Sequence, residues 1–236
     1  MKENHFKDKS QRRAFISKLA AGAATIGLAS LAPVSTQAAP LPVLTHENSD
    51  PESPDAMFNN IKGKHRIVFD VTAPHDIFPF AWPRVFLMTN QKTGTPEKDC
   101  SVVVILRHGG IPYAFQNQIW EKYNFGPMFK ADDPATKAPS MRNPFWMPKK
   151  GEYKIPGFGE VPIGINELQD SGVMFFVCDA AMTVYSAVVA EKMKMDPADV
   201  KREWIAGLLP NVRPVPSGVW AVGRAQEHGC TYCFVA

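Results

Sequence analysis

The sequence predicts an α/β fold in which a parallel sheet is flanked by helices. Short, wholly apolar segments such as 101–106 and 173–178 have the length and composition of strands that are buried on both faces, which is typical of parallel sheets. From His65 onward such segments alternate with helical patterns, as crossover connections require. The apolar share of 45% is sufficient for one globular core.

The order of the expected elements follows from hydrophobic periodicity. Pro83 must lie in the first turn of its helix, because proline has no N–H to donate. Two prolines restrict the short strand at 212–216 to an edge of the sheet, or else lie at a strand end. The helix at 180–193 is expected to bury Ala181, Val184, Tyr185, Val188 and Val189. In chain order we expect strands at 64–71, 101–106, 173–178, 212–216 and 230–235, and helices at 80–89, 163–170, 180–193, 197–208 and 218–228.

The N-terminus resembles a twin-arginine export signal. Arg12 and Arg13 precede an apolar stretch from Leu19 to about Ala32, and the small residues before and at Ala38 suit a signal peptidase. This stretch of about 14 residues is shorter than the roughly 20 that a membrane-spanning helix needs. We therefore expect residues 1–38 to direct export to the periplasm and to be cleaved after Ala38. An uncleaved membrane anchor and an ordinary basic N-terminal helix are the alternatives.

The positive charge of the chain belongs to this signal. Residues 1–38 hold six of the 26 Lys and Arg but two of the 23 Asp and Glu, so the remainder has 20 basic and 21 acidic residues, a net charge of −1. This balance argues against nucleic acid as a partner. Residues 39–62, rich in proline and acidic residues, are expected to be a flexible tail or linker. Residues 63–236 are expected to form a single domain with an insertion at about 113–162.

Several short motifs in the C-terminal part carry a family resemblance. Val177-Cys178-Asp179-Ala180-Ala181 follows an apolar run, and Leu208-Leu209-Pro210 and Val215-Pro216-Ser217-Gly218 precede a last helix and strand. This arrangement resembles the DsrE-like sulfur-relay family over roughly 64–112 and 163–236. The resemblance implies a small flavodoxin-like sheet, a homotrimer or homohexamer, and persulfide chemistry on Cys178. Its implied partner is a sulfur donor or acceptor, either a protein or a small sulfur compound.

The setting of Cys178 gives an independent reason to expect chemistry there. A cysteine at a strand end that also begins a helix faces unpaired backbone N–H groups and the positive end of the helix dipole, which favour a thiolate. His108 and His75 each follow a strand, so in a parallel sheet both lie at the same carboxyl edge and could accept the thiol proton. These three residues form the candidate catalytic site. Alternatively, Cys178 is a buried apolar residue and the histidines are structural.

The other three cysteines have different settings. Cys100 precedes its strand and is expected at the opposite edge, roughly 20 Å away, as a structural residue. Cys230 and Cys233 form a CxxC, but residues three apart on an extended strand point to opposite faces, which suits neither a redox pair nor a zinc site. The loop at 107–110 lacks the spacing of a dinucleotide-binding loop. We expect no cofactor and no metal, with copper on scattered methionines as an open alternative.

The insertion at 113–162 is rich in proline, aromatic residues and methionine. It begins at the carboxyl end of the strand before His108, so it is expected either to pack over the surface or to cover Cys178. Two function classes remain open: a sulfur-handling protein, and a non-catalytic protein for small-ligand binding or assembly. A redox protein that uses Cys230 and Cys233 is a third. An accessible Cys178 in a pocket favours the first class, and a buried thiol under an apolar cover favours the second.

Overall fold

Residues 54–235 are described by a computed structural model. They form an α/β fold around a five-stranded parallel sheet, as the sequence predicts, and the arrangement is consistent with a flavodoxin-like fold. The strand order is β6-β5-β2-β1-β7. The expected export signal and its expected cleavage site lie outside the described residues. The strands are β1 (His65–Val71), β2 (Cys100–Leu106), β5 (Met174–Cys178), β6 (Val212–Val215) and β7 (Thr231–Val235).

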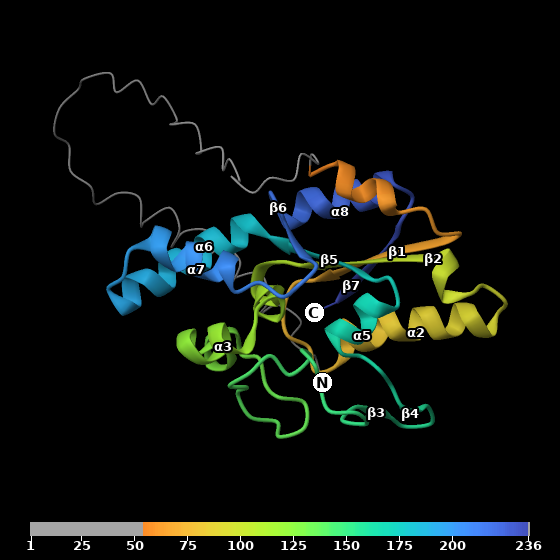
Figure 1. The fold of residues 1–236 in the computed structure, drawn as a ribbon, viewed down its shortest axis with the longest axis horizontal. Coiled ribbons are helices and arrows are strands. Elements are labelled where there is room, and N and C mark those ends of the chain that lie inside the picture. The colour runs from red at the N-terminus through yellow and green to blue at the C-terminus, as the bar shows by residue number, and fades with distance from the viewer. Residues whose placement is uncertain (1–53, 236) are drawn as a thin grey trace, which may run out of the picture. The chain divides into compact units, whose positions relative to one another are not determined.

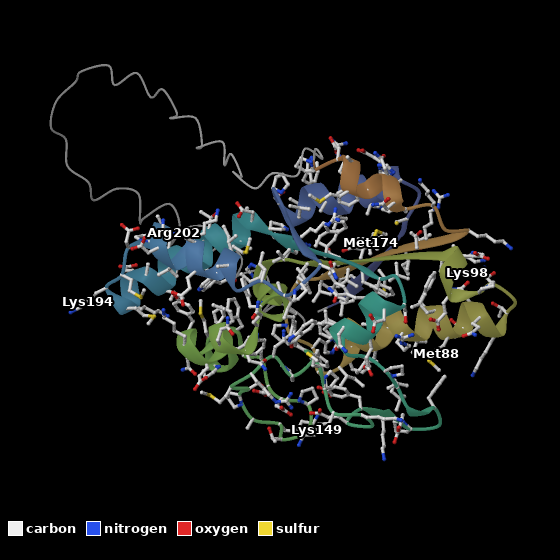
Figure 2. All side chains as sticks on the ribbon, viewed as in Figure 1. Met88, Lys98, Lys149, Met174, Lys194 and Arg202 are labelled. Carbon is white, nitrogen blue, oxygen red and sulfur yellow. The ribbon has the colours of Figure 1, made fainter. Side chains whose placement is uncertain are left out.

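Helices cover both faces of the sheet (Figure 1). The first face packs in one core cluster with α2 (Phe78–Lys92), α5 (Ile165–Asp170), α6 (Asp179–Met193) and α7 (Pro197–Ala206). The second face packs in a smaller cluster with α8 (Gly218–Glu227) and the 3₁₀ helix η1 (Ala56–Asn60). In Figure 2, Lys194, which follows α6, marks the outer end of the α6–α7 pair, and Arg202 lies along α7.

The chain changes face between β5 and β6. From β5 it continues into α6 on the first face, whereas from β6 it continues into α8 on the second. After β6 the chain reverses its direction across the sheet, because β7 lies at the opposite edge. Since parallel crossovers are right-handed, this reversal places the connecting helix α8 on the second face. In open α/β sheets, ligands bind at the carboxyl ends of strands whose connections leave in opposite directions. Cys178 and Ser217 stand at that point, as the N-caps of α6 and α8.

Two expected boundaries are corrected by the structure. Helix α2 begins at Phe78, with Pro79 in its first turn, so Pro83 lies inside the helix rather than in the first turn. The expected tail at 39–62 overlaps η1, where Phe58 is fully buried and its ring stacks on Phe176 at 4.9 Å between centroids. Packing against the second face therefore makes residues from about 56 onward part of the domain, because this apolar ring covers the end of the sheet.

The buried face of α6 also differs from the expectation. Val189 is buried, but Val184 and Val188 are 61% and 40% exposed. The face that packs on the core is instead formed by Met182, Ser186, Val189 and Ala190. The reason is that α6 packs chiefly on α7 and also on η3, which leaves these valines on the outer side of the helix. An exposed apolar surface on a helix is a candidate protein contact.

The insertion contributes to the main core rather than forming a loose loop. Its aromatic side chains join the first core cluster, and Trp120 and Phe145 are fully buried there. The buried Asn143 side chain donates to Tyr113 O and Phe115 O, which ties the start of the segment to its later part. Its elements are η3 (His108–Ala114), α3 (Asn117–Tyr123), α4 (Phe125–Phe129), β3 (Lys154–Ile155) and β4 (Gly159–Glu160).

One further element completes the description of residues 54–235. The short 3₁₀ helix η2 (Glu97–Asp99) leads into β2. Within the described part of the chain, no helix has the length and apolar character to cross a membrane.

Candidate functional site

Cys178 ends β5 and caps α6. Its Sγ accepts a hydrogen bond from the backbone N of Ala181 at 3.3 Å, and no other residue among 54–235 hydrogen-bonds to this sulfur. The residue is 6% exposed and belongs to the first core cluster. The predicted location at the carboxyl edge is therefore confirmed. The geometry is that of an N-cap in which sulfur replaces the usual oxygen acceptor, so a negative charge on the sulfur faces the positive end of the helix.

The residue after Cys178 anchors the start of α6. Asp179 is 7% exposed, and its Oδ2 accepts from Lys201 Nζ of α7 at 2.9 Å. Lys201 Nζ also donates to Thr183 Oγ1 at 2.8 Å. The other carboxylate oxygen of Asp179 is buried and has no hydrogen-bond partner among the described residues. This ion pair fixes the first turn of α6 against α7, and with it the position of the Cys178 cap.

A second ion pair lies at the same edge of the sheet. Arg107 directly follows β2, and its Nε and Nη2 donate to the two carboxylate oxygens of Asp70 at 2.6 and 2.8 Å. The Asp70 side chain is 2% exposed and that of Arg107 is 26% exposed. Tyr232 of β7 donates its hydroxyl to Asp70 Oδ2 at 2.8 Å. A two-point pair of this kind fixes the plane of the guanidinium as well as its position.

The start of α8 holds the Arg107 side chain from the other side. A Cβ built on Gly218 meets Arg107 Cβ at 2.4 Å, a distance that real Cβ atoms essentially never show. Gly218 is thus required because the Arg107 side chain lies directly on its backbone. The loop before α8 also contacts the start of α6, since Ala180 N donates to Pro216 O at 3.3 Å. Arg107 and the N-termini of both helices therefore converge at the change of face.

Arg107 is electrostatically linked to Cys178. The hydrogen bond to Asp70 is the main cause that raises the pKa of Arg107, and the charges of Asp70, Tyr232 and Cys178 add to the shift against the opposing effect of burial. The guanidinium is thus a permanent positive charge at the end of β2, next to the end of β5, where Leu106 pairs with Val177.

The two predicted histidines lie on the expected edge but differ in their contacts. His108 begins η3 with a φ of 49°, is exposed, and has its Nδ1 3.3 Å from the Tyr185 hydroxyl of α6. His75 is exposed in the loop after β1, and its ring packs on Phe78 with centroids 5.0 Å apart. Neither ring hydrogen-bonds to Cys178 in the part of the chain that the structure covers. His108 is linked to the Cys178 helix through Tyr185, whereas His75 is not brought to the site.

The remaining cysteines lie away from Cys178. Cys100 pairs with His65 at the start of the parallel strands, the opposite edge, as predicted. Cys230 packs in the second core cluster and Cys233 against the first, so the two side chains lie on opposite faces of the sheet. Burial raises the pKa of Cys230 to about 11. Among residues 54–235, no three His, Cys, Asp or Glu side chains gather closely enough to hold a metal ion.

A cavity of about 610 Å³ lies at the amino edge of the sheet. Its lining includes Lys62, Arg66, Cys100 and Met174. Since Cys178 stands at the other end of the strands, we assign this cavity no part in the chemistry of Cys178.

Sequence reasoning missed Asp70, Arg107 and Tyr232. A signal for the first two was present, because Asp70 interrupts an apolar strand and Arg107 follows the neighbouring strand directly. A carboxylate buried in a parallel sheet requires a cationic partner, and the next strand end supplies one. No comparable signal pointed to Tyr232. It reaches Asp70 because β7 pairs with β1, and the local sequence does not determine which strand lies beside β1.

No known family matches the sequence, and no curated protein is detectably similar to it. Among solved structures, the fold is similar to a protein of unknown function, MTH1491 from Methanobacterium thermoautotrophicum. The two are 17% identical with a TM-score of 0.33, and the match covers 72% of this chain and 99% of that one.

Proposed function

We propose that this chain is an exported DsrE-like protein that accepts or relays sulfane sulfur as a persulfide on Cys178. The observation that carries the proposal is the setting of one sulfur atom. Cys178 Sγ caps α6, accepts from Ala181 N and interacts electrostatically with Arg107. A thiolate is the species that attacks sulfur, and both neighbours stabilise a negative charge on this atom.

The proposed transfer is balanced without an external oxidant. The Cys178 thiolate attacks the outer sulfur of a donor persulfide R–S–SH, which forms the Cys178–S bond and breaks the donor S–S bond. The electron pair of the broken bond leaves with the donor as the thiolate R–S⁻, and the proton stays with the transferred sulfur. Passage to an acceptor thiolate repeats these steps in the opposite direction. Arg107 stabilises the anionic forms of Cys178 before and after transfer.

Burial of Cys178 sets a condition on this reaction. Because the residue is 6% exposed, a donor reaches Sγ only when the neighbouring segments open. Once closed, the same surroundings keep water and other thiols from a reactive persulfide. η3 carries His108 and contacts α6 and β5, so its movement is the opening that we propose.

A second function is favoured by the same burial. A non-catalytic protein for small-ligand binding or assembly needs no accessible thiol, and Cys178 lies in the first core cluster. In this alternative the pair of Asp70 and Arg107 serves the stability of the sheet edge. A redox function of Cys230 and Cys233 has no geometric support, since their side chains lie on opposite faces.

The proposal includes location and assembly. We propose export through the twin-arginine route to the periplasm, which replacement of Arg12 and Arg13 by lysine should block in a fractionation experiment. We also propose a homotrimer or homohexamer, for which the exposed Val184 and Val188 of α6 offer a contact surface. Light scattering should then give a mass that is a multiple of three chains, and a single-chain mass would count against it.

The experiment for the proposed function is intact-mass analysis after exposure to glutathione persulfide. The native protein should gain sulfur in a form that a reducing agent removes. Cys178→Ser should lose this gain, whereas Cys100→Ser, which removes a thiol at the opposite edge, should retain it. A native protein that gains no sulfur, with Cys178 inert to alkylation until the chain unfolds, would instead support the binding or assembly function.

A further inference from the structure

Strand β7 is an open edge of the sheet without the usual protection. Among the described residues its neighbour in the sheet is β1 alone. Tyr232 and Phe234 are 46% and 52% exposed on one face of the strand. The segment Thr231–Val235 contains neither a charged residue nor proline, which are the devices that normally prevent an edge from pairing with another strand.

The pairing with β1 determines which peptide groups of β7 point outward. Val235 O accepts from Thr72 N at 3.1 Å, so the peptide groups of Val235 face β1. Successive residues of a strand face alternate sides in the plane of the sheet, so Cys233 also faces β1. Tyr232 and Phe234 therefore present their N–H and C=O groups to the open side. These four groups per chain are the hydrogen-bonding capacity of the edge.

We propose that β7 pairs antiparallel with β7 of a second copy of this chain, about a two-fold axis that passes beside Cys233. In this register Tyr232 lies opposite the partner's Phe234, and Phe234 lies opposite the partner's Tyr232. The outward groups of both chains then form four hydrogen bonds, and a shift of register by two residues loses some of them. The two sheets join into one sheet of ten strands. This inference does not depend on sulfur chemistry.

A second copy fits this edge because the edge is complementary to itself. The two aromatic side chains become cross-strand pairs, which are among the stabilising pairs of antiparallel sheets. The hydroxyl of Tyr232 already donates to Asp70 in the single chain, which holds the ring in place. Pairing therefore costs little side-chain entropy at Tyr232. The strand carries no charge that would repel an identical strand. An isologous contact of this kind closes on itself as a dimer.

The register places the two Cys233 residues directly opposite each other. They form a non-hydrogen-bonded antiparallel pair, in which the Cα atoms lie about 4.5 Å apart. This spacing falls within the range that a disulfide spans. Cys233 is a free, half-buried thiol in the single chain. The oxidant diamide should therefore link two chains, as it takes two electrons and two protons from the two thiols while their S–S bond forms.

The test combines mass and cross-linking on the purified chain. Light scattering should give an even number of chains, and Phe234→Lys should halve that number because it places like charges across the axis. Phe158→Lys is the matched control, since Phe158 is 48% exposed on another part of the molecule. Diamide should produce a dimer on a non-reducing gel. Cys233→Ser should abolish this dimer, and Cys100→Ser, which removes another half-buried thiol, should not.

Two results would overturn the inference. One is an odd number of chains in the wild type, including a single chain. That result would mean that a second copy does not pair with β7. The other is a diamide dimer that persists in Cys233→Ser. If Phe234→Lys fails to fold, the cross-linking arm still decides, because it uses the native edge. Should the chain also form the proposed trimer, the two contacts together give six chains, and Phe234→Lys then gives three.

Discussion

Arg107 and Asp70 form a two-point ion pair at the carboxyl edge of the sheet, with oxygen–nitrogen distances of 2.6 and 2.8 Å. The carboxylate is buried in the sheet, and the Arg107 side chain lies against Gly218 at the start of α8. The pair therefore places a fixed positive charge at the same edge of the sheet as Cys178.

Removal of Arg107 should strongly destabilise the fold. Arg107→Met leaves the Asp70 carboxylate buried without its cation, which costs about 3–5 kcal/mol of unfolding free energy for a buried pair. The double variant Asp70→Leu with Arg107→Met removes both charges and should regain most of that loss. Urea unfolding of the three proteins measures the difference. Equal stability of Arg107→Met and the wild type would show that the pair carries little energy.

Two glycines on α8 should respond oppositely to alanine. Gly218→Ala places a Cβ 2.4 Å from Arg107 Cβ, so it should displace Arg107 and cost about 1–3 kcal/mol, as overpacking does. Gly223→Ala has nothing within 4 Å of the new Cβ and should stabilise the helix by about 0.5–1 kcal/mol. Thermal or urea unfolding of both variants tests this contrast. A tolerated Gly218→Ala would contradict the close approach of Arg107 to α8.

Cys230 should resist alkylation in the folded protein. Its pKa is raised to about 11, because burial disfavours the thiolate more than Arg66 favours it. At about pH 8 roughly one Cys230 in a thousand is then ionised. Timed reaction with iodoacetamide, followed by mass spectrometry, should show slow labelling that accelerates about tenfold per pH unit and becomes rapid in denaturant. Fast labelling of folded Cys230 at neutral pH would contradict this burial.

The contact between the insertion and α7 should depend on pH. The pKa of Glu203 lies below its ordinary value of 4.5, chiefly because Lys122 donates to it, with a further contribution from the Tyr123 hydroxyl and an opposing effect of burial. The folded carboxylate thus binds a proton less tightly than the unfolded one. Its contribution to stability is full above about pH 4.5 and is lost as the pH falls through the lower folded value.

Glu203→Gln should therefore destabilise the protein at about pH 7 and much less at about pH 3. The measurement is the urea midpoint of both proteins at the two pH values. Both groups of the main pair are partly exposed, so the difference at neutral pH should be small. A difference that is larger in acid would reverse the sign of the expected shift.

The strands were predictable because their signals are local. Segment 173–178 is apolar on both faces and ends where a helical pattern starts, so Cys178 could be placed at the carboxyl edge from sequence. The same reasoning separated Cys100 from Cys178 and the side chain of Cys230 from that of Cys233. The exact faces of helices were less predictable. Val184 has an apolar pattern typical of burial, yet the packing of α6 on α7 leaves it exposed.

The polar part of the site was not predictable in the same way. His108 and His75 follow strands, as Arg107 does, but an edge position does not determine which side chain points toward the sulfur. That choice depends on Gly218, whose missing side chain makes room for Arg107, and on Asp70, whose burial requires a cation. Both are tertiary relationships between segments far apart in the sequence.

The claim that Cys178 is the sulfur acceptor is tested most directly by peptide mapping after exposure to glutathione persulfide and alkylation. Trypsin separates the cysteines, because Cys178 lies in Ile155–Lys192, Cys100 in Asp99–Arg107, and Cys230 with Cys233 in Ala225–Ala236. We predict one additional sulfur in Ile155–Lys192. Additional sulfur in either of the other two peptides, with none in Ile155–Lys192, would contradict the account.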